Sequence, residues 1–249
     1  MWEVRQTTVY GKKIGDQYQK ANKIIPDELQ KESDLLVIHR QQADVQRTLF
    51  KRLTSTLGEG EVLILADFKE NWKLALRQTQ ATREFYSFQE ITHLCLIVYY
   101  VDDGQIKSDR THHLSEKLNH DSFFVHHVLQ SISHHPRVQS AKILHWLSDT
   151  GSHFRNKAIA HMILSQNSSI TKGKETRLHF FLECHGKNPC DSSFADLTRT
   201  VHSHIGTQTI TTVDQLIDFF TSVQDQGWLD HSHTFISFLS LTQPLPAGF

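Results

Sequence analysis

Short, continuous apolar runs alternate with segments of helical spacing from residue 61 onward, and this order limits the fold more than any other feature of the sequence. EVLILADF (61–68) and AKILHWL (141–147) have the length and apolar content of buried central strands. Three more segments are expected to be strands: 84–88, 91–101 and 178–183. Because helical segments separate the later strands, we expect an α/β fold with one mixed sheet and helices packed on its faces.

Apolar residues at helical spacing predict the remaining elements. Residues 27–57 form one long helix or two shorter ones, with Asp27 as a candidate N-cap and Gly58 following the helix end. Four further helices are expected at 120–134, 152–164, 191–202 and 212–223. The chain then divides into a helical N-terminal extension (1–58), an α/β core (59–205) and a C-terminal helical cap (206–249).

The composition indicates a folded domain, because 38% of the 249 residues are hydrophobic and 15 Phe and 4 Trp can build a core. It excludes collagen-like, disordered and disulfide-framework proteins. No apolar run is long enough to span a bilayer and the first residues lack the pattern of a signal peptide, so no membrane partner is expected. Three Cys cannot all pair, which favours reduced thiols and an intracellular location, nuclear if the source is eukaryotic.

The charge argues against a purely electrostatic nucleic-acid binder, because the net charge is −1 with His neutral. The positive residues are unevenly placed, however. All 26 Lys and Arg residues lie at or before Arg199. Any polyanion is therefore expected to contact the part of the chain before that residue.

Acidic residues recur where the expected strands end. Asp67 ends the first apolar run, Asp149 follows the run at 141–147, and Asp191 lies at the start of the helix after the last strand. Ligands of open α/β sheets bind outside the carboxyl ends of the strands. If the strands that carry Asp67 and Asp149 are parallel neighbours, their two carboxylates lie side by side.

These acids predict a cation site. Carboxylates held a few Å apart repel one another, and a divalent cation relieves that repulsion. Oxygen ligands alone favour magnesium or manganese over zinc. Two such ions about 4 Å apart activate a water or hydroxyl and stabilise the leaving oxygen in phosphodiester chemistry. The sequence therefore predicts two Mg²⁺ (or Mn²⁺) ions held by Asp67, Asp149 and Asp191.

Three motifs resemble one superfamily. LSDTGSHFRN, which contains Asp149, resembles the segment around the second catalytic acid of ribonuclease H-like integrases and DDE transposases. ADFKENW, with Asp67, resembles the first-acid strand of the same superfamily. HGKNPCD (185–191) resembles the HGK-x-x-CD motif of a group of transposase-derived proteins. The resemblance covers about residues 60–205.

The resemblance implies a ribonuclease H-like fold for the core, a five-stranded mixed sheet flanked by helices. It implies a metal-dependent polynucleotidyl transferase or nuclease that cleaves and joins DNA, with Asp67 and Asp149 as the first two metal ligands. For the third acid, Asp191 ranks first because it matches the HGK-x-x-CD motif, and Asp196 and Glu183 are alternates. The superfamily would usually offer Glu on this helix, where this chain has Asp.

Polar residues near the motifs are candidate phosphate contacts. They are His185, Lys187, Arg155 and Asn71. Trp72 and Trp146 are expected in the core rather than as platforms for base stacking. The chain has no evident helix-turn-helix or zinc finger, so specific DNA targeting would be supplied elsewhere. The sequence is compatible with a homo-oligomer.

Three alternatives stay open. The chain is a catalytically inactive, domesticated module that binds DNA or protein, or it is a ribonuclease or junction resolvase, or it is a zinc-stabilised interaction domain. The zinc site would take its ligands from Cys184, Cys190, His202 and His204, although no CxxC or HxxxH pair is present. The other paired histidines, 112–113, 126–127 and 134–135, are expected at the surface or at helix ends. No G-x-S-x-G elbow, Walker motif or dinucleotide glycine motif is present.

Overall fold

The structure of the chain is a computed structural model, which describes residues 27–74, 90–116, 121–165, 168, 170–181 and 188–238. The chain divides into two compact units, Met1–Gln42 and Ala43–Phe249. The sheet and every site discussed below belong to the second unit. Among the described residues, no helix combines the length and the apolar character that crossing a bilayer requires.

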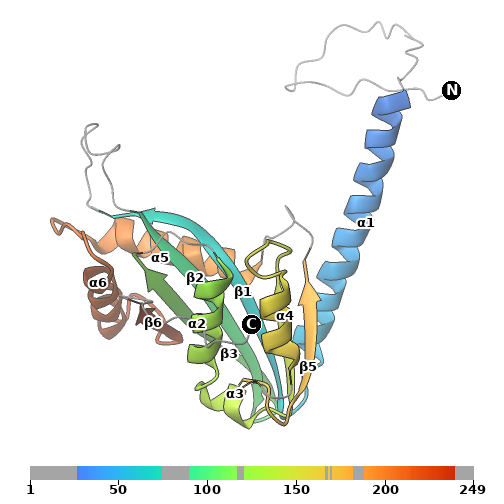
Figure 1. Cartoon of the computed structure of the whole chain (residues 1–249). Helices are drawn as coiled ribbons and strands as arrows, with labels where there is room; N and C mark the ends of the chain where they lie inside the picture. Colours follow the sequence, from blue (N-terminus) through green and yellow to red (C-terminus); the bar gives the residue numbers. More distant parts are fainter. Residues whose placement is uncertain are drawn as a thin grey trace, which may run out of the picture. The chain divides into compact units, whose positions relative to one another are not determined.

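Six helices and six strands are described, and Figure 1 labels them in chain order. They are α1 (Asp27–Ser55), β1 (Glu61–Lys73), β2 (Glu90–Asp102), β3 (Gln105–Ser115), α2 (Ser122–Ile132), α3 (Pro136–Ser140), β4 (Ile143–Ser148), α4 (Lys157–Leu164), β5 (Glu175–Phe180), α5 (Pro189–His204), α6 (Val213–Asp225) and β6 (His233–Ser237).

The strands form one mixed sheet in the order β5-β4-β1-β2-β3-β6. β1, β2 and β3 form an antiparallel meander. β4 is parallel to β1, β5 is parallel to β4, and β6 is parallel to β3. The mixed α/β architecture predicted from the alternation of apolar runs and helical segments is confirmed at this level.

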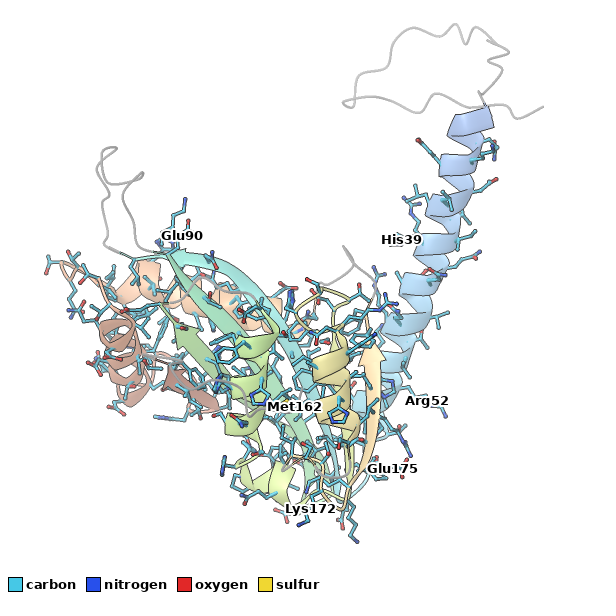
Figure 2. All side chains as sticks on the ribbon, viewed as in Figure 1. His39, Arg52, Glu90, Met162, Lys172 and Glu175 are labelled. Atoms are coloured by element: carbon cyan, nitrogen blue, oxygen red, sulfur yellow. The ribbon has the colours of Figure 1, made fainter. Side chains whose placement is uncertain are left out.

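Helices cover both faces of the sheet (Figure 1). Alternate residues of a strand point to opposite faces. On β1, Val62, Ile64 and Ala66 therefore join a core cluster with residues of α2 and α4. Met162 of α4, labelled in Figure 2, belongs to this cluster. Leu63 and Leu65 point the other way, to a cluster that includes the start of α5.

A third cluster lies between the far end of the sheet and helices α5 and α6. It contains Trp72 of β1, which is 5% exposed. Trp146 of β4 is buried in the cluster under α2 and α4. The prediction that both indoles belong to the core is confirmed.

Two strands were absent from the sequence prediction. β3 has the polar sequence QIKSDRTHHLS, and only its second half is buried. It follows β2 through a tight turn in which Asp103 and Gly104 have positive φ of 53° and 70°. β6 lies inside the predicted helical cap and joins the sheet, so that segment is not helical throughout. The strand expected at 84–88 lies outside the described residues.

The 27–57 segment is one helix, α1, which is one of the two arrangements that the sequence left open. Other helix boundaries differ from the predicted ones for local reasons. After α2, Pro136 begins the short helix α3 at its first turn, where its missing N–H costs nothing. Helix α4 begins after Asn156, whose side chain accepts from the Ile159 N–H, rather than at Ser152.

The histidine pair at 112–113 was predicted at the surface, and this was wrong. His112 and His113 are both 0% exposed on the buried half of β3. Burial lowers the pKa of His113 to about 3, so its ring is neutral at physiological pH. A pair of adjacent polar residues looks like a surface feature in a sequence, whereas in a strand the two side chains enter the cores on opposite faces.

Candidate functional site

Two predicted acids lie at one edge of the sheet. The parallel register of β1 and β4 ends at the pair Ala66 and Ser148. Asp67 and Asp149 are the next residues on the two strands, so the strand geometry brings them abreast, as the sequence predicted. Asp67 points to the same face as Leu63 and Leu65, toward the start of α5.

The backbone after β4 holds Asp149 in place. The Gly151 N–H donates to Asp149 Oδ1 over 2.8 Å, and His153 Nε2 lies 3.6 Å from the same oxygen. A Cβ on Gly151 would lie 2.5 Å from Cε1 of His153, which is closer than real Cβ contacts. A side chain at residue 151 would therefore require the His153 ring to move, because this turn brings that ring against the backbone.

The third acid, Asp191, lies in the first turn of α5. The Asn188 N–H donates to Asp191 Oδ2 over 2.9 Å, while Asn188 Oδ1 accepts from the Cys190 N–H over 2.8 Å. The two bonds form a reciprocal capping box at the helix start. Asn188 also donates from Nδ2 to Asp67 Oδ2 over 2.7 Å. This residue joins the start of α5 to β1, and we call Asp67, Asp149 and Asp191 the carboxylate centre.

The electrostatics of the carboxylate centre are unfavourable for Asp67. The pKa of Asp67 is raised to about 7, chiefly by burial; the hydrogen bond from Asn188 lowers it, and the charges of Asp191 and Asp149 contribute to the rise. The carboxyl groups of Asp149 and Asp191 are thus close enough to act on that of Asp67. A carboxylate that is desolvated and faces like charges favours either a proton or a bound cation.

The donor set fits a hard divalent cation in chemistry. All three side chains offer carboxylate oxygens, which Mg²⁺ and Mn²⁺ prefer. The pKa of Asp67 is raised chiefly by burial and in part by the charges of Asp191 and Asp149, and a cation would offset both effects. In the described part of the chain, however, no three His, Cys, Asp or Glu side chains converge closely enough to hold an ion. The side chain of Asp191 is instead engaged in the α5 cap.

Of the two alternates for the third acid, the structure describes Asp196, which is less well placed than Asp191. Asp196 forms an ion pair with Arg199 and acts electrostatically on His233 of β6, further along α5 than the carboxylate centre. Glu183 lies outside the described residues. Of the two candidates that the structure describes, Asp191 is the one whose charge raises the pKa of Asp67.

The proposed phosphate contacts divide into two groups. His185 and Lys187 lie outside the described residues. Arg155 is exposed in the turn that follows Asp149, and this position would allow it to contact a strand of nucleic acid. Asn71 Nδ2 donates to Glu90 Oε2 over 3.1 Å across β1 and β2, near the start of β2 (Figure 2).

The proposed zinc site is not formed. Cys190 and His202 lie in the first and last turns of the single helix α5, so about 18 Å of helix axis separates them. Ligands of one zinc ion lie within about 4 Å of one another. Cys190 is fully buried, with its Sγ 3.8 Å from the Cys95 carbonyl oxygen, and His204 stacks on Trp228. Cys184 lies outside the described residues.

Sequence reasoning missed Asn188. The sequence does contain a helix-start pattern at this position. Asn188 is followed by a proline at the first helical position and by Asp191 three residues later, which matches a capping box. The sequence alone does not show that Asn188 contacts Asp67 of β1, because 121 residues separate the two along the chain.

Comparison with known proteins gives one match. A family model described as "Domain of unknown function (DUF8701)" matches residues 46–236. No curated protein and no solved structure matches the chain. The matched range contains all three acids of the carboxylate centre and every strand of the sheet except the last residue of β6.

Proposed function

The chain belongs to the DUF8701 family, and we propose that it is a ribonuclease H-like, metal-dependent polynucleotidyl transferase or nuclease that cleaves and joins DNA. We place its action on intracellular DNA, in the nucleus if the source is eukaryotic. The observation that carries the proposal is the carboxylate centre, in which Asp67 and Asp149 lie abreast and Asp191 acts on the Asp67 charge.

The strand arrangement supports the fold part of the proposal. Strands β1 to β5 form a five-stranded mixed segment of the sheet, and helices cover both of its faces. The proposed fold has five strands in a mixed sheet with flanking helices. Strand β6 is an addition at the β3 edge.

The residues of the centre would divide the work. Asp67 and Asp149 would hold two Mg²⁺ or Mn²⁺ ions, and Asp191 would complete the set. Bound ions of this kind activate a water or a 3′-hydroxyl and stabilise the leaving oxygen of a phosphodiester. Asn188 orients Asp67 through its 2.7 Å hydrogen bond, and the Gly151 N–H orients Asp149. Asp67 must release its proton before it can bind a cation, because burial holds that proton to about pH 7.

A second candidate function has one observation in its favour. The Asp191 carboxylate accepts the Asn188 N–H of the α5 cap, and the described residues contain no preformed group of three metal ligands. This arrangement suits a descendant that keeps the fold but has lost catalysis, and that binds DNA or a protein. A ribonuclease or junction resolvase would differ from the first candidate only in its substrate.

Nicking of supercoiled plasmid by the full chain in Mg²⁺ or Mn²⁺ separates these candidates. We expect Asp149→Asn to lower the nicking rate by at least about 100-fold, because a ligand and its charge are lost while the shape is kept. Asp225→Asn, which changes an exposed carboxylate at the end of α6, is the matched control and should nick at the wild-type rate.

Each result has a clear meaning. Nicking that needs a divalent cation and disappears in Asp149→Asn supports the enzyme. Equal nicking by wild type and Asp149→Asn means that the activity does not come from this centre. If none of the proteins nicks while all of them retain binding to DNA, the inactive module is the better account.

A further inference from the structure

Three buried histidines form a hydrogen-bonded chain across the sheet on the α5 side. The Trp72 indole N–H donates to His93 Nδ1 over 2.9 Å. His93 Nε2 lies 2.9 Å from His112 Nδ1, and His112 Nε2 lies 2.8 Å from His233 Nδ1. We call His93, His112 and His233 the histidine chain. It runs through β2, β3 and β6, starting on the strand next to β1 and ending at the β6 edge of the sheet.

The Trp72 indole fixes the tautomer of every ring in the histidine chain. An indole nitrogen only donates, so His93 must accept at Nδ1 and carry its proton at Nε2. His112 therefore accepts at Nδ1 and carries its proton at Nε2, and His233 in turn accepts at Nδ1 from His112. Each ring is thus a neutral Nε2–H tautomer, and the chain ends at His233 Nε2–H, which is a donor. No acceptor for this N–H is found among the described residues.

The free end of the histidine chain lines a cavity. His233 is 7% exposed, and it forms part of the wall of a hollow of about 360 Å³ between the second half of α5 and the segment that leads into β6. Arg110, Arg199, Asp196 and Asp230 also line this hollow. Arg110 Nη1 donates to Ser232 Oγ over 2.8 Å, which fixes one end of its guanidinium.

An aromatic wall separates this cavity from a second one. His204 and Trp228 stack with ring centroids 4.0 Å apart and planes 17° apart, and both residues line both cavities. The second cavity, of about 650 Å³, has a largely uncharged lining that includes Gln208, Gln215 and Gln226. Trp228 is 53% exposed, which is unusual for an indole in a folded domain.

The chemistry of the first cavity selects a neutral, planar, polar ligand. Two Arg side chains are balanced by two Asp side chains, so the net charge does not favour an anion. The lining instead offers donors and acceptors side by side, with one donor that the histidine chain keeps fixed. An exposed indole at the rim favours a flat ring that stacks. A nucleobase has these properties, because its edge carries donors and acceptors and its faces are aromatic.

We propose that this cavity receives an unpaired nucleobase, which stacks on Trp228 and accepts a hydrogen bond from His233 Nε2–H. The proposal deepens the proposed function and rests on it for the source of the base, a single-stranded segment of the DNA substrate. Helix α5 connects the two sites, since Arg199 lies about 12 Å and His204 about 20 Å along the helix axis from Asp191. A few nucleotides of single strand would span that distance.

Fluorescence anisotropy with labelled oligonucleotides tests the proposal. The probes are a twelve-residue oligothymidylate and an abasic strand of the same length, both in EDTA so that the carboxylate centre holds no metal. We expect Trp228→Ala to weaken oligothymidylate binding by about tenfold, because one stacked base is lost, and to leave abasic binding unchanged. Trp228→Phe should restore most of the affinity. Leu164→Ala, at an apolar residue that is 49% exposed on α4, is the matched control.

A competition arm identifies the source of the base. Free thymidine that displaces oligothymidylate at millimolar or lower concentration would mean that the cavity binds nucleosides by themselves. Displacement only by oligonucleotides would mean that the base is read within a strand.

The outcomes separate this proposal from the proposed function. Unchanged oligothymidylate affinity in Trp228→Ala, or an equal loss for the abasic strand, overturns the base site whatever the nicking assay gives. Base-dependent binding by a protein that does not nick DNA would support the base site and contradict the proposed enzymatic function.

Discussion

The carboxylate centre and the histidine chain both bury titratable groups away from water, but the two regions differ in how the buried groups are stabilised. In the histidine chain, burial lowers the pKa of His93 and His112 well below the ordinary value. The rings stay neutral and satisfy one another through hydrogen bonds. In the carboxylate centre, burial and the charges of the neighbouring carboxyl groups together raise the pKa of Asp67 to about 7.

The difference supports the proposal that the carboxylate centre, and not the histidine chain, binds an ion. A buried network in which each member has a partner is stable as it stands. A buried carboxyl group beside like charges is destabilising until a proton or a cation arrives, and perturbed groups of this kind gather at functional sites. In this account the histidine chain is a structural element that ends in a fixed donor, while the carboxylate centre is the site that we propose to be reactive. The predictions below test that contrast.

The largest effect is expected for His112→Ala, in the middle of the histidine chain. The change leaves His93 Nε2–H and His233 Nδ1 without their shared partner and opens a cavity where no water has access. We expect the free energy of unfolding to fall by about 3–5 kcal/mol in urea denaturation at pH 7. The exposed His134→Ala is the control and should change it by less than about 0.5 kcal/mol. Similar values for the two variants would contradict a structural role for the chain.

For Asp67→Asn without divalent cations, we expect the free energy of unfolding to rise rather than fall. The folded state holds the Asp67 proton up to about pH 7, whereas the unfolded chain releases it near 3.8. The wild-type protein therefore loses stability from this group as pH rises from about 4 to 7, and below that window the contribution is fully present. An amide has no such loss, so at pH 8 in EDTA we expect Asp67→Asn to be more stable by about 1–3 kcal/mol.

Urea denaturation at pH 4 and pH 8 measures this effect. The advantage of Asp67→Asn should be present at pH 8 and nearly absent at pH 4. A variant less stable than wild type at pH 8 would mean that the Asp67 carboxylate is well accommodated, and that the contrast with the histidine chain is wrong.

A smaller effect is expected for Asn188→Ala. The α5 cap is lost, at a cost of about 1 kcal/mol in the free energy of unfolding. The pKa of Asp67 should also rise, because the hydrogen bond that lowers it is removed. Thr212→Ala removes the equivalent cap of α6 and should leave the Asp67 pKa unchanged. Carboxyl ¹³C titration by NMR measures the pKa in each protein, and equal values in both variants would contradict the link between Asn188 and Asp67.

The sequence predicts the part of the fold whose side chains are apolar on both faces. EVLILADF and AKILHWL are buried strands because their residues enter cores above and below the sheet. Since Asp67 and Asp149 end these two runs, their adjacency follows once the strands are parallel neighbours. This is why the position of the centre could be predicted without a structure.

The parts that escaped prediction are polar residues whose partners lie far along the chain. Strand β3 was missed because half of it is exposed, and His112 was placed at the surface because its partners, His93 and His233, belong to other strands. The cavity beside Trp228 is likewise made by α5 and the segment before β6. Local periodicity carries no information about such contacts between distant segments.

The central claim is that Asp67 and Asp149 bind divalent cations, and a crystal soaked in Mn²⁺ at pH 8 tests it most directly. Anomalous scattering should locate at least one Mn²⁺ with oxygens of Asp67 and Asp149 about 2 Å away. A second soak at pH 5.5, where Asp67 holds its proton, should show much lower occupancy. Mn²⁺ bound elsewhere, or carboxylates that remain without an ion at both pH values, would contradict the claim.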